Sequence, residues 1–469
     1  MRSKVYLVGA GPGVPDLITI RGLNILRQAD VIIYDYLIDK RILAEARPDA
    51  ELICCDTLRK DRYSDGFLLH NEKINQLVVK KAKEGKKVIR LKNGDPGVFS
   101  RISQELEPLV KNKIEFEIVP GVTAASAASC LSGIPLSDRR FASSCVFVTG
   151  HEDPKKKRSI LDWQSLAGCG TIVLYMAVEN LANIVKWLVE SGKDPDTRVA
   201  IIQDASLLTQ KVLTGTLKDI VVKAKKNKIK PPAIIIIGEV VKLEKKFNWL
   251  KKNKRILFTG ISGERFFEKG FIFHLPLIKI IPLEDYRHFD TLLKNIENYD
   301  WIVFLSRYGV QYFFKRLNEI GLDARKLNNT KIAAIGSSTQ NRLRDFGIQV
   351  QLVPKDESSK GLINEFKKID IKKKRMFLPR SDISDKDLEG ALKSLGAVVQ
   401  SAVAYRNVMP DNLPDLDLKL FDEIMFSSPS GVRNFVKRYK FIPKKVRVYC
   451  IGEVTLREAK RYGLMVDGV

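Results

Sequence analysis

The chain has 469 residues, enough for about three domains at roughly 150 residues each. A hydrophobic content of 45% is ordinary for a soluble globular protein. No segment reaches the ~18 continuous apolar residues that a membrane helix needs. Met1–Lys4 leads directly into an apolar stretch, which predicts a cytoplasmic protein without a signal peptide or a membrane partner.

The formal net charge of +25 indicates an anionic partner or a merely lysine-rich surface. Basic runs such as Lys372–Arg375 contain no interleaved aromatic residues, so we expect no nucleic-acid partner. A polyacidic small molecule remains compatible with the charge. The six cysteines show no C-x-x-C spacing and the four histidines are scattered, so we expect reduced thiols and no metal site.

Strand-like runs alternate with helical patterns, which predicts parallel-sheet α/β domains. In the first half we expect strands near 4–9, 31–35, 87–91, 116–119, 144–149, 171–175, 198–203 and 233–237. We expect helices over 17–29, 71–84, 101–112, 122–132, 178–191 and 216–226. Pro120–Val122 suggests a hinge between two lobes.

The charged segment around Lys242–Lys254 separates the first half from a new strand at Arg255–Thr259. An amphipathic membrane anchor is one interpretation. The apolar face of this segment (Phe247, Trp249, Leu250) is short, which favours a linker.

The opening strand ends in the turn Gly9-Ala-Gly11-Pro12-Gly13. Ligands of open α/β sheets bind at the carboxyl ends of the strands, so the turn predicts a small-molecule site. It departs from a dinucleotide fingerprint, because Pro12 removes a backbone donor where a phosphate cradle needs one.

Later turns add polar and small residues at further strand ends. Asp35 is at the carboxyl end of the strand expected near 31–35 and is either a helix cap or a functional carboxylate. A polar turn runs from Asn93 to Phe99, and Thr123-Ala124 opens a helix of small residues that permits close approach of a ligand.

The second half contains an internal repeat. The pattern Ser306-x-x-Gly-Val-x-x-Phe-x-x-Arg316 matches the segment Ser428–Arg438, and the Ile-Gly-x-x-Thr339 turn matches the one at Thr455. Helix N-termini offer free N–H groups to anions, so the four turns predict either a shared ligand cleft between two lobes or simple helix caps. Their occurrence in two matching pairs favours the cleft.

Taken in order, the turns of residues 3–245 resemble the tetrapyrrole methylase family, whose fold is two-lobed α/β and not a Rossmann fold. Tyr34–Ile38 and Pro135–Arg139 resemble the branch of uroporphyrinogen-III C-methyltransferases. The resemblance implies S-adenosyl-L-methionine as cofactor and S-adenosyl-L-homocysteine as its product. It also implies methylation of uroporphyrinogen III at carbons 2 and 7 to precorrin-2, for sirohaem and cobalamin-type pathways.

The resemblance also implies site residues. Those expected to line the cofactor pocket are Pro12, Asn93, Gly94, Asp95, Val98, Thr123, Ala124, Met176 and Ala205. Asp35 matches the family's acid/base carboxylate. The second proton-transfer group of the family is a lysine; an ungapped count places it at Thr57 and a short insertion at Lys60, which we favour because threonine is a poor acid.

Residues 254–469 resemble the uroporphyrinogen-III synthase family through Ser427–Val432, Leu378–Ser381 and Ala402–Tyr405. That family has a two-lobed α/β fold and closes hydroxymethylbilane with loss of water. Tyr405 matches a tyrosine that assists departure of the hydroxyl, or is a packed interlobe aromatic. Thr339 and Thr455 match positions that the family associates with binding, and the repeat turns add Ser306 and Ser428 as expected substrate-binding residues.

These resemblances predict a methyltransferase over 1–245 (lobes 1–119 and 123–245), a linker at 246–253 and a synthase over 254–469. The synthase lobes are expected at 254–288 plus 405–469 and at 289–404, with a shortened C-terminus. The resemblance also implies a homodimer through the first half. The alternatives are a methyltransferase with an inactive synthase-like domain, a later corrin-ring methylase, and an RNA-associated methylase.

Overall fold

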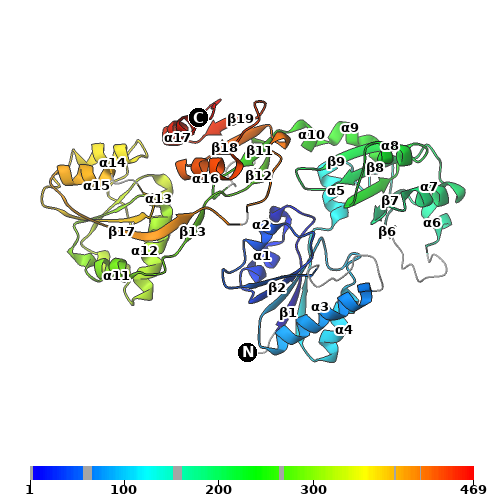
Figure 1. Cartoon of the computed structure of the whole chain (residues 1–469), viewed down its shortest axis with the longest axis horizontal. Helices are drawn as coiled ribbons and strands as arrows, with labels where there is room; N and C mark the ends of the chain where they lie inside the picture. The colour runs from blue at the N-terminus through cyan, green and yellow to red at the C-terminus, as the bar shows by residue number, and fades with distance from the viewer. Residues whose placement is uncertain are drawn as a thin grey trace.

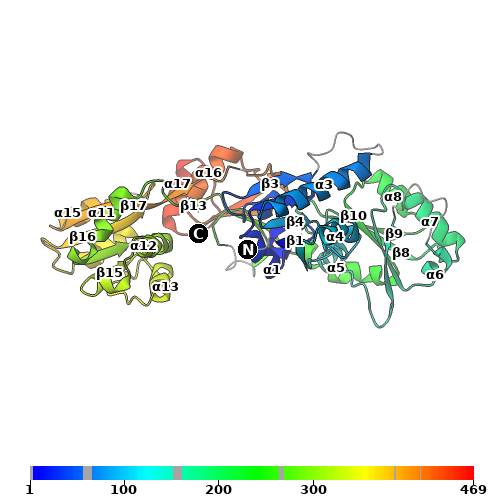
Figure 2. The same ribbon diagram turned by 90° about the horizontal axis from the view of Figure 1, so that it is seen from below.

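The computed structural model describes residues 4–55, 66–150, 161–262, 269–384, 387–411 and 413–468. The described chain forms four β-sheets with helices packed on them (Figure 1). The second and fourth sheets in chain order lie at the two ends of an elongated molecule, and the first and third lie between them, as two views agree (Figures 1 and 2).

The first sheet has the order β3-β2-β4-β1-β5, and all its strands are parallel. Its strands are β1 (Lys4–Gly9), β2 (Val31–Tyr34), β3 (Glu51–Cys54), β4 (Val88–Lys92) and β5 (Glu115–Val119). Its helices are η1 (Pro15–Leu17), α1 (Ile20–Leu26), α2 (Lys40–Leu43), α3 (Gly66–Lys83) and α4 (Ile102–Lys111). α1 and α2 cover one face and α3 and α4 the other, giving three layers.

The second sheet, of order β6-β7-β10-β8-β9, is mixed. β6 and β7 are parallel, whereas β10 is antiparallel to β7 and β8, and β9 is antiparallel to β8. The parallel sheet expected here is therefore wrong, and β9 was not predicted. The elements are β6 (Cys145–Thr149), β7 (Thr171–Tyr175), β8 (Arg198–Gln203), β9 (Lys211–Thr216), β10 (Ala233–Ile237), α5 (Ala124–Ser132), α6 (Trp163–Ala167), α7 (Leu181–Glu190) and α8 (Ile220–Lys226).

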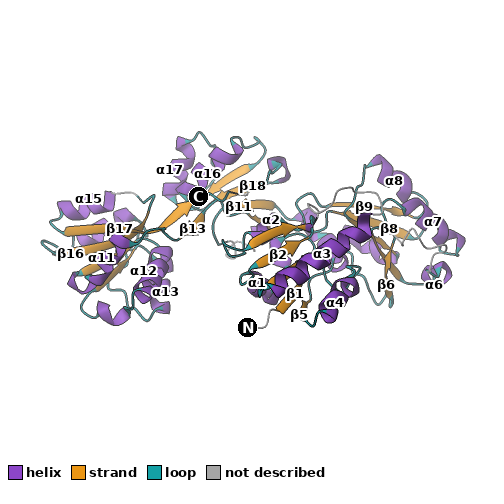
Figure 3. Cartoon of the chain, turned by 60° about the horizontal axis from the view of Figure 1, so that its bottom comes forward, coloured by secondary structure: helices purple, strands orange, loops and turns teal. Residues whose placement is uncertain are grey.

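The third sheet, of order β12-β11-β18-β19, is parallel. It comprises β11 (Arg255–Phe258), β12 (Phe271–His274), β18 (Glu423–Phe426) and β19 (Arg447–Cys450), with helices η7 (Leu418–Leu420), α16 (Pro429–Tyr439) and α17 (Glu453–Arg461). Two segments far apart in the sequence thus build one sheet, in the layered arrangement that Figure 3 shows.

The fourth sheet, of order β13-β17-β16-β14-β15, is parallel except for its edge strand β13. Its strands are β13 (Lys279–Ile281), β14 (Trp301–Phe304), β15 (Lys331–Ala334), β16 (Arg375–Ser381) and β17 (Val398–Val408). Its helices are α11 (Arg287–Lys294), η5 (Ile296–Asn298), α12 (Arg307–Glu319), η6 (Ala324–Leu327), α13 (Ser337–Asp345), α14 (Ser359–Phe366) and α15 (Asp387–Ser394). The predicted lobe boundaries after residue 288 and before residue 405 fall within α11 and within β17. The strand β13, which was expected in the first synthase lobe, pairs with β17 in this sheet.

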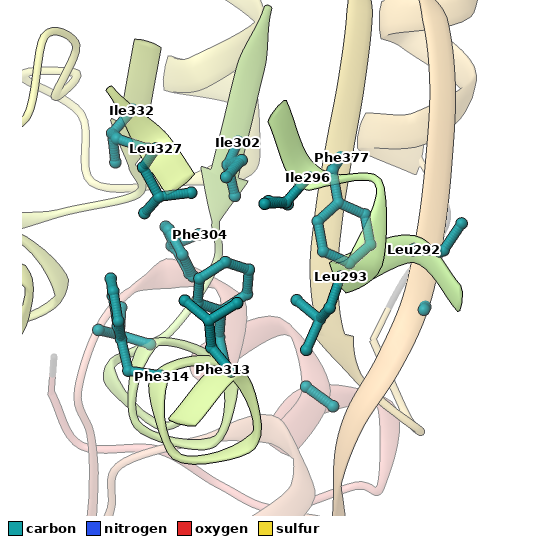
Figure 4. Packing of buried hydrophobic residues seen from close by; sticks show 14 of the residues in the cluster. Leu292, Leu293, Ile296, Ile302, Phe304, Phe313, Phe314, Leu327, Ile332 and Phe377 are labelled. Atoms are coloured by element: carbon teal, nitrogen blue, oxygen red, sulfur yellow. The ribbon is translucent and has the colours of Figure 1, made fainter. Parts of the chain in front are cut away.

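A dense aromatic core fixes the fourth sheet. Phe304, Phe313 and Phe377 are fully buried in one cluster with aliphatic side chains from α11 and β15 (Figure 4). The rings of Phe304 and Phe313 meet edge to face at 5.2 Å, a geometry that aromatic pairs favour. The core therefore places the carboxyl ends of β14, β16 and β17 rigidly.

The segment expected to be a linker packs against the second sheet. It forms η3 (Glu239–Leu243), α9 (Glu244–Phe247) and α10 (Trp249–Lys252). Leu250 is buried, and the indole Nε1 of Trp249 donates to the carbonyl of Cys130 in α5 at 2.9 Å. In the described residues, no helix is both long and apolar enough to cross a membrane.

Candidate functional site

Three turns meet at the carboxyl ends of β1, β4 and β5. The Gly11 amide donates to the Gly94 carbonyl at 3.2 Å, and the Gly94 amide donates back to Gly11 at 2.8 Å. A Cβ on Gly9 would lie 2.7 Å from both the Gly94 oxygen and the Gly121 Cα, so the backbones approach as closely as glycine allows. The three turns form one continuous backbone surface.

Asp95 ties two of these turns together. One carboxylate oxygen accepts from the Gly97 amide at 2.7 Å and the other from the Gly121 amide at 2.9 Å. Beside it, Oδ1 of Asn93 is buried and accepts no hydrogen bond within the described part of the chain. The surface thus offers a buried acceptor that a bound molecule can satisfy, which fits a ligand carrying N–H groups.

The second sheet contacts the turns that follow β4 and β5. The Thr123 hydroxyl lies 2.7 Å from the buried Tyr175 hydroxyl, which also accepts from the Ala125 amide at 3.2 Å. Val98, Ala124 and Ala205 pack against the buried cluster that contains Tyr175. Burial raises the pKa of Tyr175, so its phenol is neutral.

The turns carry backbone strain. Phe99, Met176, Asp204 and Ser206 all have positive φ, between 50° and 78°. Residues other than glycine rarely adopt this backbone conformation, and such residues are concentrated at ligand-binding sites. The predicted cofactor residues lie on turns after β1, β4, β5, β7 and β8, except Ala124, which is the first residue of α5. Pro12 is half-buried beside the close glycine contact.

Asp35 follows β2 and belongs to a buried network of charges that sequence reasoning missed. Its carboxylate lies 2.5 Å from Nη2 of Arg90, which is itself 3.3 Å from Glu105. Glu105 also pairs with Lys92 at 2.5 Å. Arg90 and Lys92 are in β4 and Glu105 is in α4, so two cations and two carboxylates share one site.

Burial and the neighbouring carboxylates shift the pKa of Arg90 in opposite directions, and its side chain is 5% exposed. Burial disfavours its charge, but the Asp35 and Glu105 carboxylates prevail and raise the pKa of Arg90 above its ordinary value. A permanently charged guanidinium therefore holds Asp35. Lys60 lies outside the described residues, as does Thr57.

In the second half, the candidate Tyr405 lies in β17 and is 6% exposed. Its hydroxyl is 2.8 Å from the Ser306 hydroxyl, and its ring stacks on the Tyr312 ring with the two ring centroids 5.7 Å apart. Burial raises the pKa of Tyr405, partly offset by hydrogen bonds with Ser306 and Ser381. The phenol is held neutral among hydroxyl groups and can donate a proton or a hydrogen bond.

The repeat serines cap helices. The Ser306 hydroxyl accepts from the Gly309 amide at 2.9 Å, and the Ser428 hydroxyl accepts from the Gly431 amide at 3.2 Å. Thr339 and Thr455 are each 3% exposed in the first turns of α13 and α17. The structure thus gives the repeat a capping role, and substrate binding by these residues stays a prediction.

Arg307 joins the third and fourth sheets, and sequence reasoning missed it. Its Nη2 donates to the Ser262 hydroxyl, after β11, at 2.5 Å and to the Tyr308 hydroxyl at 2.9 Å. No carboxylate among the described residues pairs with it. The sequence signal that could have identified Arg307 as a site residue was its position directly after the repeat serine Ser306.

Comparison with known proteins assigns both halves. Residues 4–221 match the family model of tetrapyrrole (corrin/porphyrin) methylases, and residues 265–469 match that of uroporphyrinogen-III synthase HemD. A porphyrin biosynthesis protein HemD of Ruminiclostridium josui is 35% identical over 98% of this chain and 94% of its own length.

Relatives of the first half alone are closer in sequence. A uroporphyrinogen-III C-methyltransferase of Methanocaldococcus jannaschii is 48% identical over 51% of this chain and 98% of its own length. An S-adenosyl-L-methionine-dependent uroporphyrinogen III methyltransferase of Methanosarcina barkeri is 45% identical over 51% of this chain and 93% of its own length. Both matched families consist of enzymes. The chain therefore belongs to the tetrapyrrole methylases through its first half and to the HemD-type uroporphyrinogen-III synthases through its second.

Proposed function

We propose that this enzyme closes hydroxymethylbilane to uroporphyrinogen III in its second half and methylates that product at carbons 2 and 7 in its first half, giving precorrin-2. The observation that carries the proposal is the Asp35 carboxylate, held by buried Arg90 beside turns that fit a small ligand. The names of the Methanocaldococcus and Methanosarcina relatives support the same substrate.

S-adenosyl-L-methionine supplies an electrophilic methyl group on sulfur. The protein's own task is to hold the acceptor carbon in line with that group and to exclude water. The turns at Pro12, Asn93–Val98, Thr123-Ala124, Met176 and Ala205 form the proposed surface for the donor. Asp35 accepts the proton that leaves the ring after methylation, and Lys60 is the proposed second proton-transfer group.

In the synthase half, Tyr405 donates to the departing hydroxyl of hydroxymethylbilane, which leaves as water. The Ser306 hydroxyl holds the phenol at 2.8 Å. Arg307, which has no carboxylate partner in the described chain, binds one of the substrate's eight carboxylates. Ser428, Thr339 and Thr455 are proposed to complete the anion-binding turns.

The domain division 1–245, 246–253 and 254–469 belongs to this proposal, with the fourth sheet as the second synthase lobe. The family resemblance also supports a homodimer through the first half and use of the product for sirohaem or cobalamin-type cofactors. A cytoplasmic location belongs to the proposal as well.

Feeding each half separately tests the proposal. Uroporphyrinogen III with S-adenosyl-L-methionine should yield precorrin-2, and hydroxymethylbilane alone should yield the type III isomer. Failure to methylate uroporphyrinogen III would refute the first step and favour a later corrin-ring methylase. An excess of the type I isomer would refute the synthase activity and favour an inactive synthase-like domain.

A further inference from the structure

The two halves meet through Arg41 of α2. Its guanidinium carbon lies 3.8 Å from the centroid of the Phe273 ring in β12, a close cation–π contact. Its Nη1 donates to the His274 carbonyl at 3.4 Å. Asp39 caps α2 and pairs with Arg41 at 2.7 Å, so the guanidinium is fixed from the methylase side as well. Figure 1 shows α2 beside β12.

Each partner in this contact lies at the ligand-binding end of its sheet. Arg41 follows the carboxyl end of β2, as Asp35 does. His274 is the last residue of β12, and its Nε2 lies 2.7 Å from the carbonyl of Gly260, after β11. The carboxyl ends of the first and third sheets therefore face the same junction.

The contacts continue to the synthase candidate. Arg307 bridges Ser262, after β11, to Tyr308, whose ring centroid lies 6.3 Å from that of Tyr405. A run of neighbouring side chains and turns therefore connects the surroundings of Tyr405 with those of Asp35. This run shows that the two sites are joined through packed contacts, and it is not evidence of energetic coupling between them.

The junction is anchored at a second point. Leu208, from the loop after β8, is buried in the apolar cluster of the third sheet. Elements of both the first and the second sheet therefore contact the third sheet, which belongs to the synthase half.

From these contacts we propose that the Arg41–Phe273 contact holds the two ligand-binding faces together, so that the octacarboxylate tetrapyrrole made in the second half passes to the first before it mixes with solvent. The inference rests on the proposed function. Tethered sites see one another at roughly millimolar effective concentration, which favours capture over escape when the faces are aligned.

A competition experiment on the full-length chain tests the handoff. The enzyme receives hydroxymethylbilane and S-adenosyl-L-methionine while isotopically labelled uroporphyrinogen III is present in the medium in excess. We expect the label in precorrin-2 to be at least about five-fold below its share of the free uroporphyrinogen pool. Product that carries the same share of label as the pool would overturn the proposal.

Two variants from opposite sides of the contact assign the effect to it. Arg41→Ala removes the guanidinium, and Phe273→Leu removes the ring face while leaving α2 unchanged. Each should let the label reach its share of the pool, while each half keeps its rate on its own added substrate. Lys40→Ala is the matched control, because Lys40 is an exposed cation on the same helix. Direct transfer that persists in both variants would show that the Arg41–Phe273 contact is not required for it.

The separate assays keep two failures apart. A wild-type chain in which one half ignores its own substrate refutes the proposed function. A chain in which both halves act but the label enters freely refutes only the handoff.

Discussion

The two halves hold their candidate catalytic groups in opposite ways. In the methylase half, Asp35 is bound to a buried guanidinium within a network of four charges. In the synthase half, Tyr405 is buried among neutral hydroxyl groups. Each arrangement suits its proposed step: the carboxylate that accepts a proton is held in place by a guanidinium, and the phenol that donates one is kept neutral.

The largest expected effect comes from removing the charged acceptor. Asp35→Asn should lower methylation of uroporphyrinogen III by about 10²- to 10⁴-fold, because an amide cannot take up the proton. The ratio of type III to type I product should not change, since Tyr405 belongs to another domain. Asp49→Asn, at an exposed pair with Arg47, is the matched control. Unchanged methylation in Asp35→Asn would refute the role of this carboxylate.

Removal of Arg90 from the charge network should lower the free energy of unfolding substantially. Arg90→Met leaves Asp35 and Glu105 without their shared cation in a buried site, and removal of one partner from such a pair costs about 3–5 kcal/mol of unfolding free energy. Arg27→Met breaks an exposed pair with Glu45 and should cost less than about 1 kcal/mol. Chemical denaturation of both variants measures the difference, and equal costs would contradict a buried network.

A smaller effect is expected in the neutral site. Tyr405→Phe deletes the donor but keeps the ring, so synthase turnover should fall by about ten- to a hundred-fold, the value of a hydrogen bond of about 1.5–3 kcal/mol. Tyr312→Phe keeps the ring that stacks on Tyr405 and should be nearly silent. The assay is the rate and isomer composition of the product. A silent Tyr405→Phe would favour the packed-aromatic interpretation of this tyrosine.

The smallest effect is on stability at high pH. Since burial raises the pKa of Tyr405 above the ~10 of an unfolded tyrosine, its contribution to stability is complete below pH ~10. That contribution is lost as pH rises through the folded-state pKa. Urea midpoints from about pH 9 to about pH 11 should therefore fall less steeply in Tyr405→Phe than in the parent chain. Identical slopes would show that the phenol ionises without cost to the fold.

Four strands of the first sheet and the capping serines could be predicted, because apolar runs and the repeat at Ser306 and Ser428 are local signals. The edge strand β3 (Glu51–Cys54) was missed, because its four residues are exposed or half-buried and form no apolar run. The direction of β10 and the presence of β9 could not, since both depend on which strands pair across the sheet. The Arg90 network was missed for a related reason. Arg90 reads as part of an apolar strand, and its partner Glu105 comes from a helix whose place against β4 only the tertiary structure fixes.

The central claim is that one chain performs both steps, and a single reaction tests it most directly. Hydroxymethylbilane is supplied with S-adenosyl-L-methionine carrying a deuterated methyl group, and the product is examined by mass spectrometry and by isomer analysis. The account predicts a type III tetrapyrrole carrying two deuterated methyl groups on carbons 2 and 7. Unmethylated uroporphyrinogen, or methyl groups on other carbons, would contradict it.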